Sequence, residues 1–121
     1  MGSILIIDDN DDIRGFLRQV LEEAGYDVTE ACNGREGLRK FRQWPAALVI
    51  TDLFMPEQDG LEITKALRRE WPTVKIIAIT GGLGEGNFLD AAKLLGAHRT
   101  MMKPFTGEAL LQVVQEELQE R

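Results

Sequence analysis

The sequence predicts a single α/β domain in which helices cover both faces of a parallel sheet. Short apolar runs alternate with segments whose apolar residues recur every three or four positions, and these patterns are typical of buried strands and amphipathic helices. The connections between successive strands are too long for hairpins, so the strands are expected to run parallel. No break in composition divides the 121 residues. One domain is therefore expected to span residues 1–121.

Five segments have the pattern of strands. They cover residues 4–7, 26–31, 46–52, 74–80 and 99–102. The run that ends at Asp52 is apolar and contains Val49 and Ile50, which favours a strand buried on both faces. The alternating pattern of residues 26–31 predicts an outer strand instead.

Helical stripes separate these strands. The apolar positions are Ile13, Phe16, Leu17, Val20, Leu21 and Ala24 in the first; Leu38 and Phe41 in the second; Leu61, Ile63 and Leu67 in the third; Phe88, Ala91, Ala92 and Leu95 in the fourth; and Leu110, Leu111, Val114 and Leu118 in the last. Asp11 or Asp12 is expected to cap the first helix and Gly25 to end it. Thr106 is expected to cap the last helix.

Composition and charge exclude several functions. With 44% hydrophobic and 28% charged residues, the chain has the composition of a globular protein. Its net charge of −6 argues against direct binding to nucleic acid or an anionic membrane. The absence of a long apolar run and of a signal-peptide pattern predicts a cytoplasmic location. Cys32 and His98 are each the sole residue of their type, so we interpret Cys32 as a small buried residue and His98 as a surface or loop residue.

Polar side chains stand where four of the predicted strands end. They are Asp8 and Asp9, Asp52, Thr80 and Lys103. In an open parallel sheet, ligands bind beyond the carboxyl ends of the strands. Each residue alone is explained as well by a cap or a loop, but their occurrence at four strand ends favours a common site.

These residue types suit phosphoryl transfer. Clustered carboxylates need a compensating cation, and hard oxygen ligands suit Mg²⁺. An ionised Asp52 beside the metal would be the nucleophile that attacks phosphorus. Lys103 would contribute a second positive charge, and Thr80 would donate a hydrogen bond to the phosphoryl group. The glycine-rich loop at residues 81–86 would follow that movement.

At these residues the chain resembles the receiver domain of two-component response regulators, of the kind found in chemotaxis. The matching motifs are Leu5–Asp9, Asp52–Pro56 with Asp59-Gly60, Ala78–Gly81, and Gly96-Ala97 leading to Lys103-Pro104-Phe105. The resemblance implies a flavodoxin-like (βα)5 fold with strand order 2-1-3-4-5. It also implies a cis peptide bond between Lys103 and Pro104.

The resemblance implies the following roles in the site. Asp52 would accept the phosphoryl group, and Mg²⁺ would be bound by Asp8, Asp9 and Asp52 together with the main-chain oxygen of Phe54. Thr80 and Lys103 would contact the phosphoryl group. The donor would be a sensor histidine kinase or a histidine phosphotransfer protein. The domain would thus be a signalling phosphoacceptor rather than an enzyme, with self-phosphorylation and autodephosphorylation chemistry of its own.

One position departs from the family pattern. Thr100 stands three residues before Lys103, where the family usually has a Tyr or Phe that turns inward on phosphorylation. Signalling is therefore expected to rely on Thr80 and the glycine-rich loop, or the domain serves as a phosphate sink or relay. The donor would dock on the first helix near Arg14, Gly15 and Arg18, residues that fit a solvated surface equally well.

Other classes fit less well. An FMN-binding flavodoxin needs a first loop that donates hydrogen bonds to phosphate, and residues 8–12 would repel it. A haloacid-dehalogenase-like phosphatase needs an acid two residues after its nucleophile, where this chain has Phe54. The main alternative is a receiver-shaped interaction domain that works without phosphate. The downstream target, a phosphorylation-dependent dimer and an output domain elsewhere in a longer protein are left open.

Overall fold

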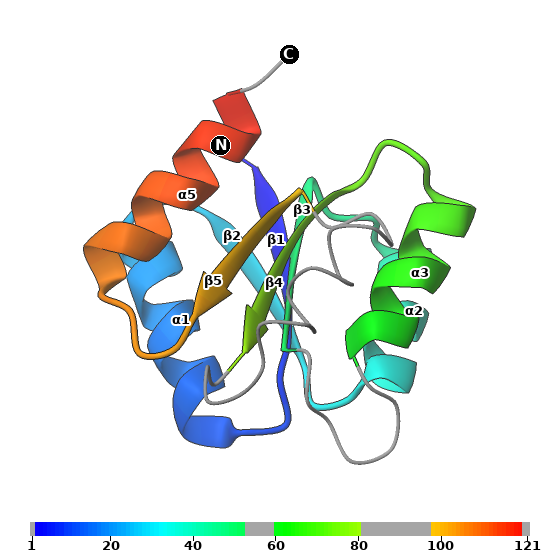
Figure 1. The fold of residues 1–121 in the computed structure, drawn as a ribbon, viewed down its shortest axis with the longest axis horizontal. Coiled ribbons are helices and arrows are strands. Elements are labelled where there is room, and N and C mark those ends of the chain that lie inside the picture. The colour runs from blue at the N-terminus through cyan, green and yellow to red at the C-terminus, as the bar shows by residue number, and fades with distance from the viewer. Residues whose placement is uncertain (1, 53–59, 81–97, 120–121) are drawn as a thin grey trace.

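A computed structural model describes residues 2–52, 60–80 and 98–119 of the chain and contains a five-stranded parallel sheet (Figure 1). The strands are β1 (Ser3–Ile7), β2 (Asp27–Ala31), β3 (Leu48–Asp52), β4 (Lys75–Thr80) and β5 (Arg99–Met102). They pair in the order β2-β1-β3-β4-β5. This confirms the predicted fold class and strand order, with the alternating segment β2 at an edge of the sheet.

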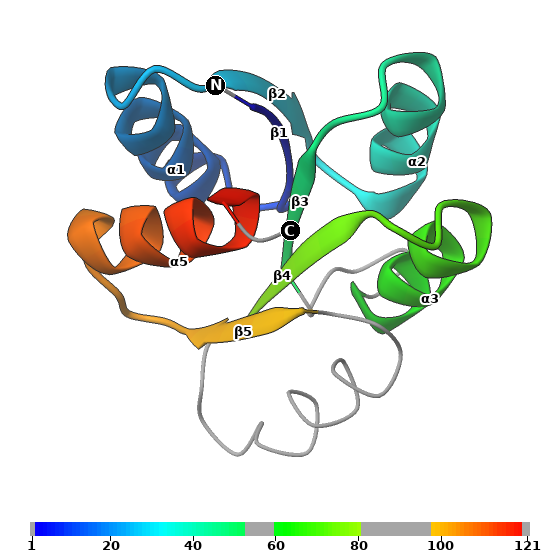
Figure 2. The same ribbon diagram turned by 90° about the horizontal axis from the view of Figure 1, so that it is seen from above.

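Helices cover both faces of the sheet. They are α1 (Asp11–Glu23), α2 (Gly34–Gln43), α3 (Gly60–Glu70) and α5 (Gly107–Gln119). Seen from above, α1 and α5 lie on one side of the sheet, and α2 and α3 lie on the other (Figure 2). None of these helices has the length and hydropathy of a membrane-spanning segment. The glycine-rich loop at residues 81–86 and the helix expected around residues 88–95 fall outside the described residues.

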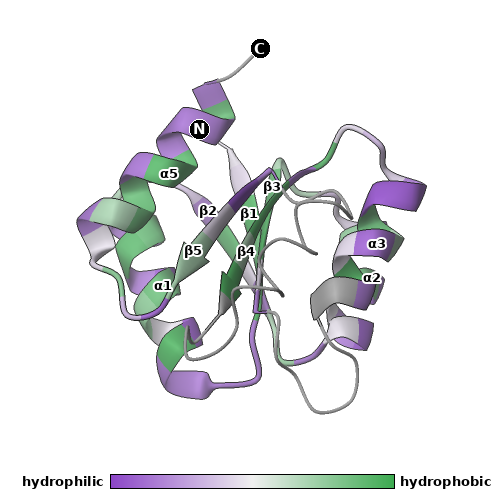
Figure 3. Cartoon of the chain, in the orientation of Figure 1, coloured by the Kyte–Doolittle hydropathy of each residue, from purple (hydrophilic) through white to green (hydrophobic). Residues whose placement is uncertain are grey.

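Each face of the sheet has its own apolar core. In β1, Leu5 and Ile7 face the cluster on the α2 and α3 side, whereas Ile4 and Ile6 face the cluster on the α1 and α5 side. The helices contribute Leu38, Phe41, Ile63 and Leu67 to the first cluster and Leu17, Leu21, Leu110 and Val114 to the second. Figure 3 shows the apolar central strands between helices in which hydrophilic and hydrophobic residues alternate. The two cores hold the strand ends, and therefore the polar residues there, on a rigid support.

The start of α1 corrects one prediction. Asn10 is the N-cap, and its side chain accepts a hydrogen bond of 3.0 Å from the main-chain N–H of Ile13. Asp11 and Asp12, which the sequence proposed as caps, occupy the first turn instead, where the N-terminal end of the helix dipole favours negative charge. Gly25, with a φ of 98°, follows the end of the helix as predicted.

The turn before α2 corrects another prediction, which concerns Cys32. Cys32 is exposed, not buried, because it lies between the end of β2 and the N-cap Asn33. The side chain of Asn33 accepts from the main-chain N–H of Glu36 at 2.8 Å, and Glu36 in turn accepts from the main-chain N–H of Cys32 at 2.8 Å. These two hydrogen bonds fix the turn, and the thiol lies outside the core.

Three predictions near β5 are confirmed. His98 is exposed, just before β5. The peptide bond between Lys103 and Pro104 is cis. Thr106 caps α5, since its hydroxyl accepts a hydrogen bond of 3.0 Å from the main-chain N–H of Ala109.

Candidate functional site

The register of the parallel sheet places the polar strand ends side by side. Ile7 in β1 pairs with Thr51 in β3, so the next residues, Asp8 and Asp52, lie level. Strand β4 runs beside β3 and ends at Thr80, one position beyond the residue that pairs with Asp52. The predicted meeting of these residues at the carboxyl edge of the sheet therefore follows from strand pairing.

Asp8, Asp9 and Asp52 form a compact cluster, called here the acid group. Each offers one carboxylate oxygen, and the three oxygens lie within 4.8 Å of one another. Asp8 and Asp52 are only 1% and 6% exposed, whereas Asp9 is open to solvent. Buried carboxylates are costly without compensating positive charge. Three hard oxygen donors at this spacing, one of them facing water, fit a divalent cation such as Mg²⁺.

Lys103 brings positive charge to the acid group. Its Nζ lies 3.4 Å from Oδ2 of Asp8 and 3.8 Å from Oδ1 of Asp52, and its side chain is 21% exposed. Lys103 follows Met102, the residue of β5 that pairs with Thr80. Within the described residues, the predicted lysine thus reaches the two buried carboxylates from the end of the edge strand β5.

A second cation contacts the loop that carries Asp8 and Asp9. The Arg14 guanidinium donates a hydrogen bond of 2.8 Å from Nη1 to the main-chain oxygen of Asp8. Its side chain is only 15% exposed, so Arg14 is less available for docking than the sequence suggested. The helical pattern placed Arg14 off the apolar stripe but contained no signal for this contact, which depends on how α1 packs beside β2.

The comparison with known families decides what kind of domain carries this site. A sequence profile described as "Response regulator receiver domain" matches residues 4–115. The chain belongs to this family. The receiver domain is 34% identical to the chemotaxis protein CheY of Thermotoga maritima over 103 residues, which make up 84% of this chain and 85% of that protein.

Solved structures of related proteins share the receiver fold. The chemotaxis protein CheY4 of Vibrio cholerae superposes with a TM-score of 0.90 at 32% identity, covering 96% of this chain and 98% of that one. The response regulator protein TrrA of Thermotoga maritima, solved in complex with Mg²⁺-BeF, superposes with a TM-score of 0.88 at 33% identity, covering 97% and 99% of the two chains. A relative of the receiver domain thus takes a divalent metal on the same fold.

Four of the predicted site residues lie together in the structure. Asp8, Asp9, Asp52 and Lys103 come together as described above. Phe54, whose main-chain oxygen was predicted as a ligand, lies outside the described residues, and for Thr80 the description covers the backbone alone. Thr100 lies in β5, half-buried and paired with Ala78.

Proposed function

We propose that this receiver domain accepts a phosphoryl group on Asp52 in a Mg²⁺-dependent reaction and signals by the change that follows. The observation that carries the proposal is the acid group with Lys103 beside it. Asp52 ends a strand that is buried along its whole length, so its carboxylate is presented from a fixed backbone. An ionised carboxylate held in this way is suited to act as a nucleophile.

The proposed phosphoryl transfer is a nucleophilic displacement at phosphorus. An oxygen of the Asp52 carboxylate forms the new bond to phosphorus as the bond from phosphorus to the donor nitrogen breaks. The imidazole keeps the electron pair of the broken bond and leaves as a neutral ring, because the other ring nitrogen of the phosphohistidine carries a proton. With acetyl phosphate as donor, the bond from phosphorus to oxygen breaks and acetate leaves.

Side chains around Asp52 would stabilise the transferred charge. Asp8, Asp9, Asp52 and the main-chain oxygen of Phe54 would hold Mg²⁺, which when bound neutralises charge on the phosphoryl oxygens. Lys103 would offer its ammonium group to another of these oxygens. Thr80 would donate a hydrogen bond from its hydroxyl to the phosphoryl group once that group is present. Because Thr80 ends β4, this hydrogen bond would couple phosphorylation to the position of that strand.

The family supports a phosphohistidine donor, either a sensor histidine kinase or a histidine phosphotransfer protein. We propose that the donor approaches along α1 beside the acid group. Gly15 leaves open space there, since a Cβ added to it would meet nothing within 4 Å. Arg18 is 42% exposed on the same helix. Arg14 is withdrawn from that surface by its contact with Asp8.

The test is intact mass after incubation with acetyl phosphate and Mg²⁺, for the parent and for Asp52→Asn. The proposal predicts one phosphate adduct on the parent, no adduct without Mg²⁺, and none on Asp52→Asn. An adduct that persists in Asp52→Asn contradicts the assignment of the nucleophile.

A purified phosphohistidine donor is the second arm of that test. If neither acetyl phosphate nor this donor modifies the parent, the phosphate-independent interaction domain becomes the better account.

A further inference from the structure

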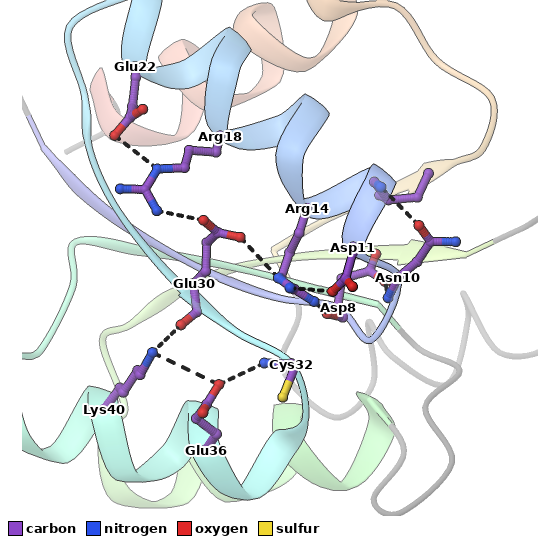
Figure 4. Close-up of polar contacts among 11 residues, drawn as sticks. Asp8, Asn10, Asp11, Arg14, Arg18, Glu22, Glu30, Cys32, Glu36 and Lys40 are labelled. Carbon is purple, nitrogen blue, oxygen red and sulfur yellow. Dashed lines mark hydrogen bonds and ion pairs between the residues drawn. The ribbon is translucent and has the colours of Figure 1, made fainter.

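Arg14 links the loop that carries Asp8 and Asp9 to the edge strand β2 (Figure 4). Besides the main-chain oxygen of Asp8, its guanidinium contacts Oδ1 of Asp11 at 2.5 Å through Nη2, and Oε1 of Glu30 at 3.0 Å through Nε. These acceptors belong to three parts of the fold: the residue after β1, the first turn of α1, and β2. The planar guanidinium holds several acceptors in a fixed geometry, which an ammonium group does not reproduce.

Glu30, the anchor on β2, is itself held from two helices. Arg18 of α1 donates to its other carboxylate oxygen, Oε2, at 2.5 Å. Lys40 of α2 donates to its main-chain oxygen at 2.5 Å. Hydrogen bonds from Arg18 and then from Arg14 lower the pKa of Glu30 below its ordinary value, so the anchor keeps its charge at neutral pH. Arg14 therefore connects the loop that carries Asp8 and Asp9 to Glu30, which is held by residues of both α1 and α2.

The main-chain contact at Asp8 constrains the metal ligands directly. Asp8 is buried, and its Oδ1 accepts a hydrogen bond of 2.9 Å from the main-chain N–H of Asn10. Its Oδ2 lies toward Lys103. With the carbonyl held by Arg14 and the carboxylate held by Asn10 and Lys103, the backbone that carries Asp8 and Asp9 has little freedom to turn.

We infer that Arg14 is a positioning residue for the divalent cation of this site. Through its own hydrogen bond to the main-chain oxygen of Asp8, it holds the backbone of Asp8 and Asp9 at the spacing seen in the acid group. The inference rests on the proposed function, because it assigns Arg14 to the same metal. Partners that orient metal ligands typically change metal affinity by one to two orders of magnitude when removed.

The charge and the geometry of Arg14 predict opposite effects on metal binding. A positive charge near the site repels Mg²⁺, so Arg14→Met would strengthen binding if only charge mattered. If Arg14 positions the ligands, the same change loosens the loop and weakens binding. Arg14→Lys keeps the charge and loses the planar fork, so a loss in this variant reports geometry alone.

Arg18 provides the matched control. It binds the same Glu30 carboxylate, and its other hydrogen bond goes to Glu22 at 3.1 Å. Neither of these contacts involves the loop that carries Asp8 and Asp9. Arg18→Lys therefore disturbs Glu30 and the surface of α1 without removing the contact to Asp8.

The experiment is calorimetric titration of the full chain with Mg²⁺, for the parent, Arg14→Lys, Arg14→Met and Arg18→Lys. Circular dichroism checks the fold of each, and Arg14→Lys alone suffices should Arg14→Met not fold. The inference predicts Mg²⁺ binding about 10-fold weaker in both Arg14 variants and unchanged in Arg18→Lys.

Three outcomes overturn the inference. Equal or tighter Mg²⁺ binding in the Arg14 variants assigns Arg14 no positioning role, while the proposed function stands if the parent binds the metal. An equal loss in Arg18→Lys assigns the effect to Glu30 and general packing. A parent that binds no Mg²⁺ overturns the proposed function and this inference together.

Discussion

Two groups of charged side chains lie next to each other in this domain and differ in their balance of charge. In the paired group, which consists of Arg14, Arg18, Glu30, Glu36 and Lys40, both acids contact cations: Glu30 binds the two arginines, and Glu36 lies 3.9 Å from Lys40. In the acid group, as far as the structure describes it, three carboxylates lie together and Lys103 contacts two of them, Asp8 and Asp52. Arg14 touches both groups.

This difference separates structure from function. A charged group whose members satisfy one another needs no ligand, and it stabilises the elements that it joins. An excess of buried negative charge is unfavourable until a cation arrives. The paired group is thus suited to hold α1, β2 and α2 together, while the acid group is suited to bind a metal and to react.

Losing a lysine from each group gives the largest expected contrast. We expect Lys103→Met to slow phosphorylation by acetyl phosphate about 100-fold, the usual order for removing one group that stabilises charge in a transition state. Lys40→Met makes the same chemical change in the paired group and is expected to leave the rate unchanged. Time courses of the phosphate adduct by intact mass measure both rates. Equal rates in the two variants would contradict the role assigned to Lys103 in phosphoryl transfer.

Neutralising one acid in each group is expected to change stability in opposite directions. Without metal, Asp9→Asn relieves repulsion and should raise the free energy of unfolding by about 1 kcal/mol, the value for two unit charges about 4 Å apart in water. Glu30→Gln removes the partner of Arg14 and Arg18 and should lower it by about 1 kcal/mol. Urea unfolding at pH 7 measures both. A loss of stability in Asp9→Asn would contradict the excess of negative charge assigned to the acid group.

The pH dependence of the paired group gives a smaller and more specific effect. Hydrogen bonds from Arg18 and Arg14 lower the pKa of Glu30 in the folded state from its ordinary value of 4.5. A carboxylate whose pKa is lowered in the folded state stabilises the fold at pH values above its ordinary pKa. This contribution is lost as the pH falls through the pKa of the folded state. The stability difference between the parent and Glu30→Gln should therefore be full at pH 7 and shrink below about pH 4.5. Unfolding curves at descending pH measure it, and a constant difference would show that the charge of Glu30 is not the cause.

The fold was predictable because each local signal agreed with the others. Apolar runs marked the strands, and the stripe that contains Leu17 and Leu21 faces the core as expected. The carboxyl-edge rule for parallel sheets was sufficient to predict that Asp8, Asp52 and Lys103 share one site. Strand order came from the family resemblance, since local patterns do not specify which strands pair.

The errors arose where neighbours in space decide the outcome. Asn10 rather than an aspartate caps α1, a choice among adjacent polar residues that propensity does not resolve. Cys32 is exposed because the capping of α2 holds it outside the core. Arg14 was interpreted as surface, but its guanidinium contacts the main-chain oxygen of Asp8 and the carboxylate of Glu30, a residue 16 positions along the chain. Sequence periodicity carries no information about such a contact.

The most direct test of the central proposal is to locate the phosphoryl group. The parent is phosphorylated with acetyl phosphate and Mg²⁺, and borohydride then reduces the acyl phosphate to an alcohol, which marks the modified side chain permanently. Peptide mass spectrometry reads the position. The account predicts the mark on Asp52, with Asp8 and Asp9 unmodified. A mark on any other residue would contradict the assignment of Asp52 as the phosphoacceptor.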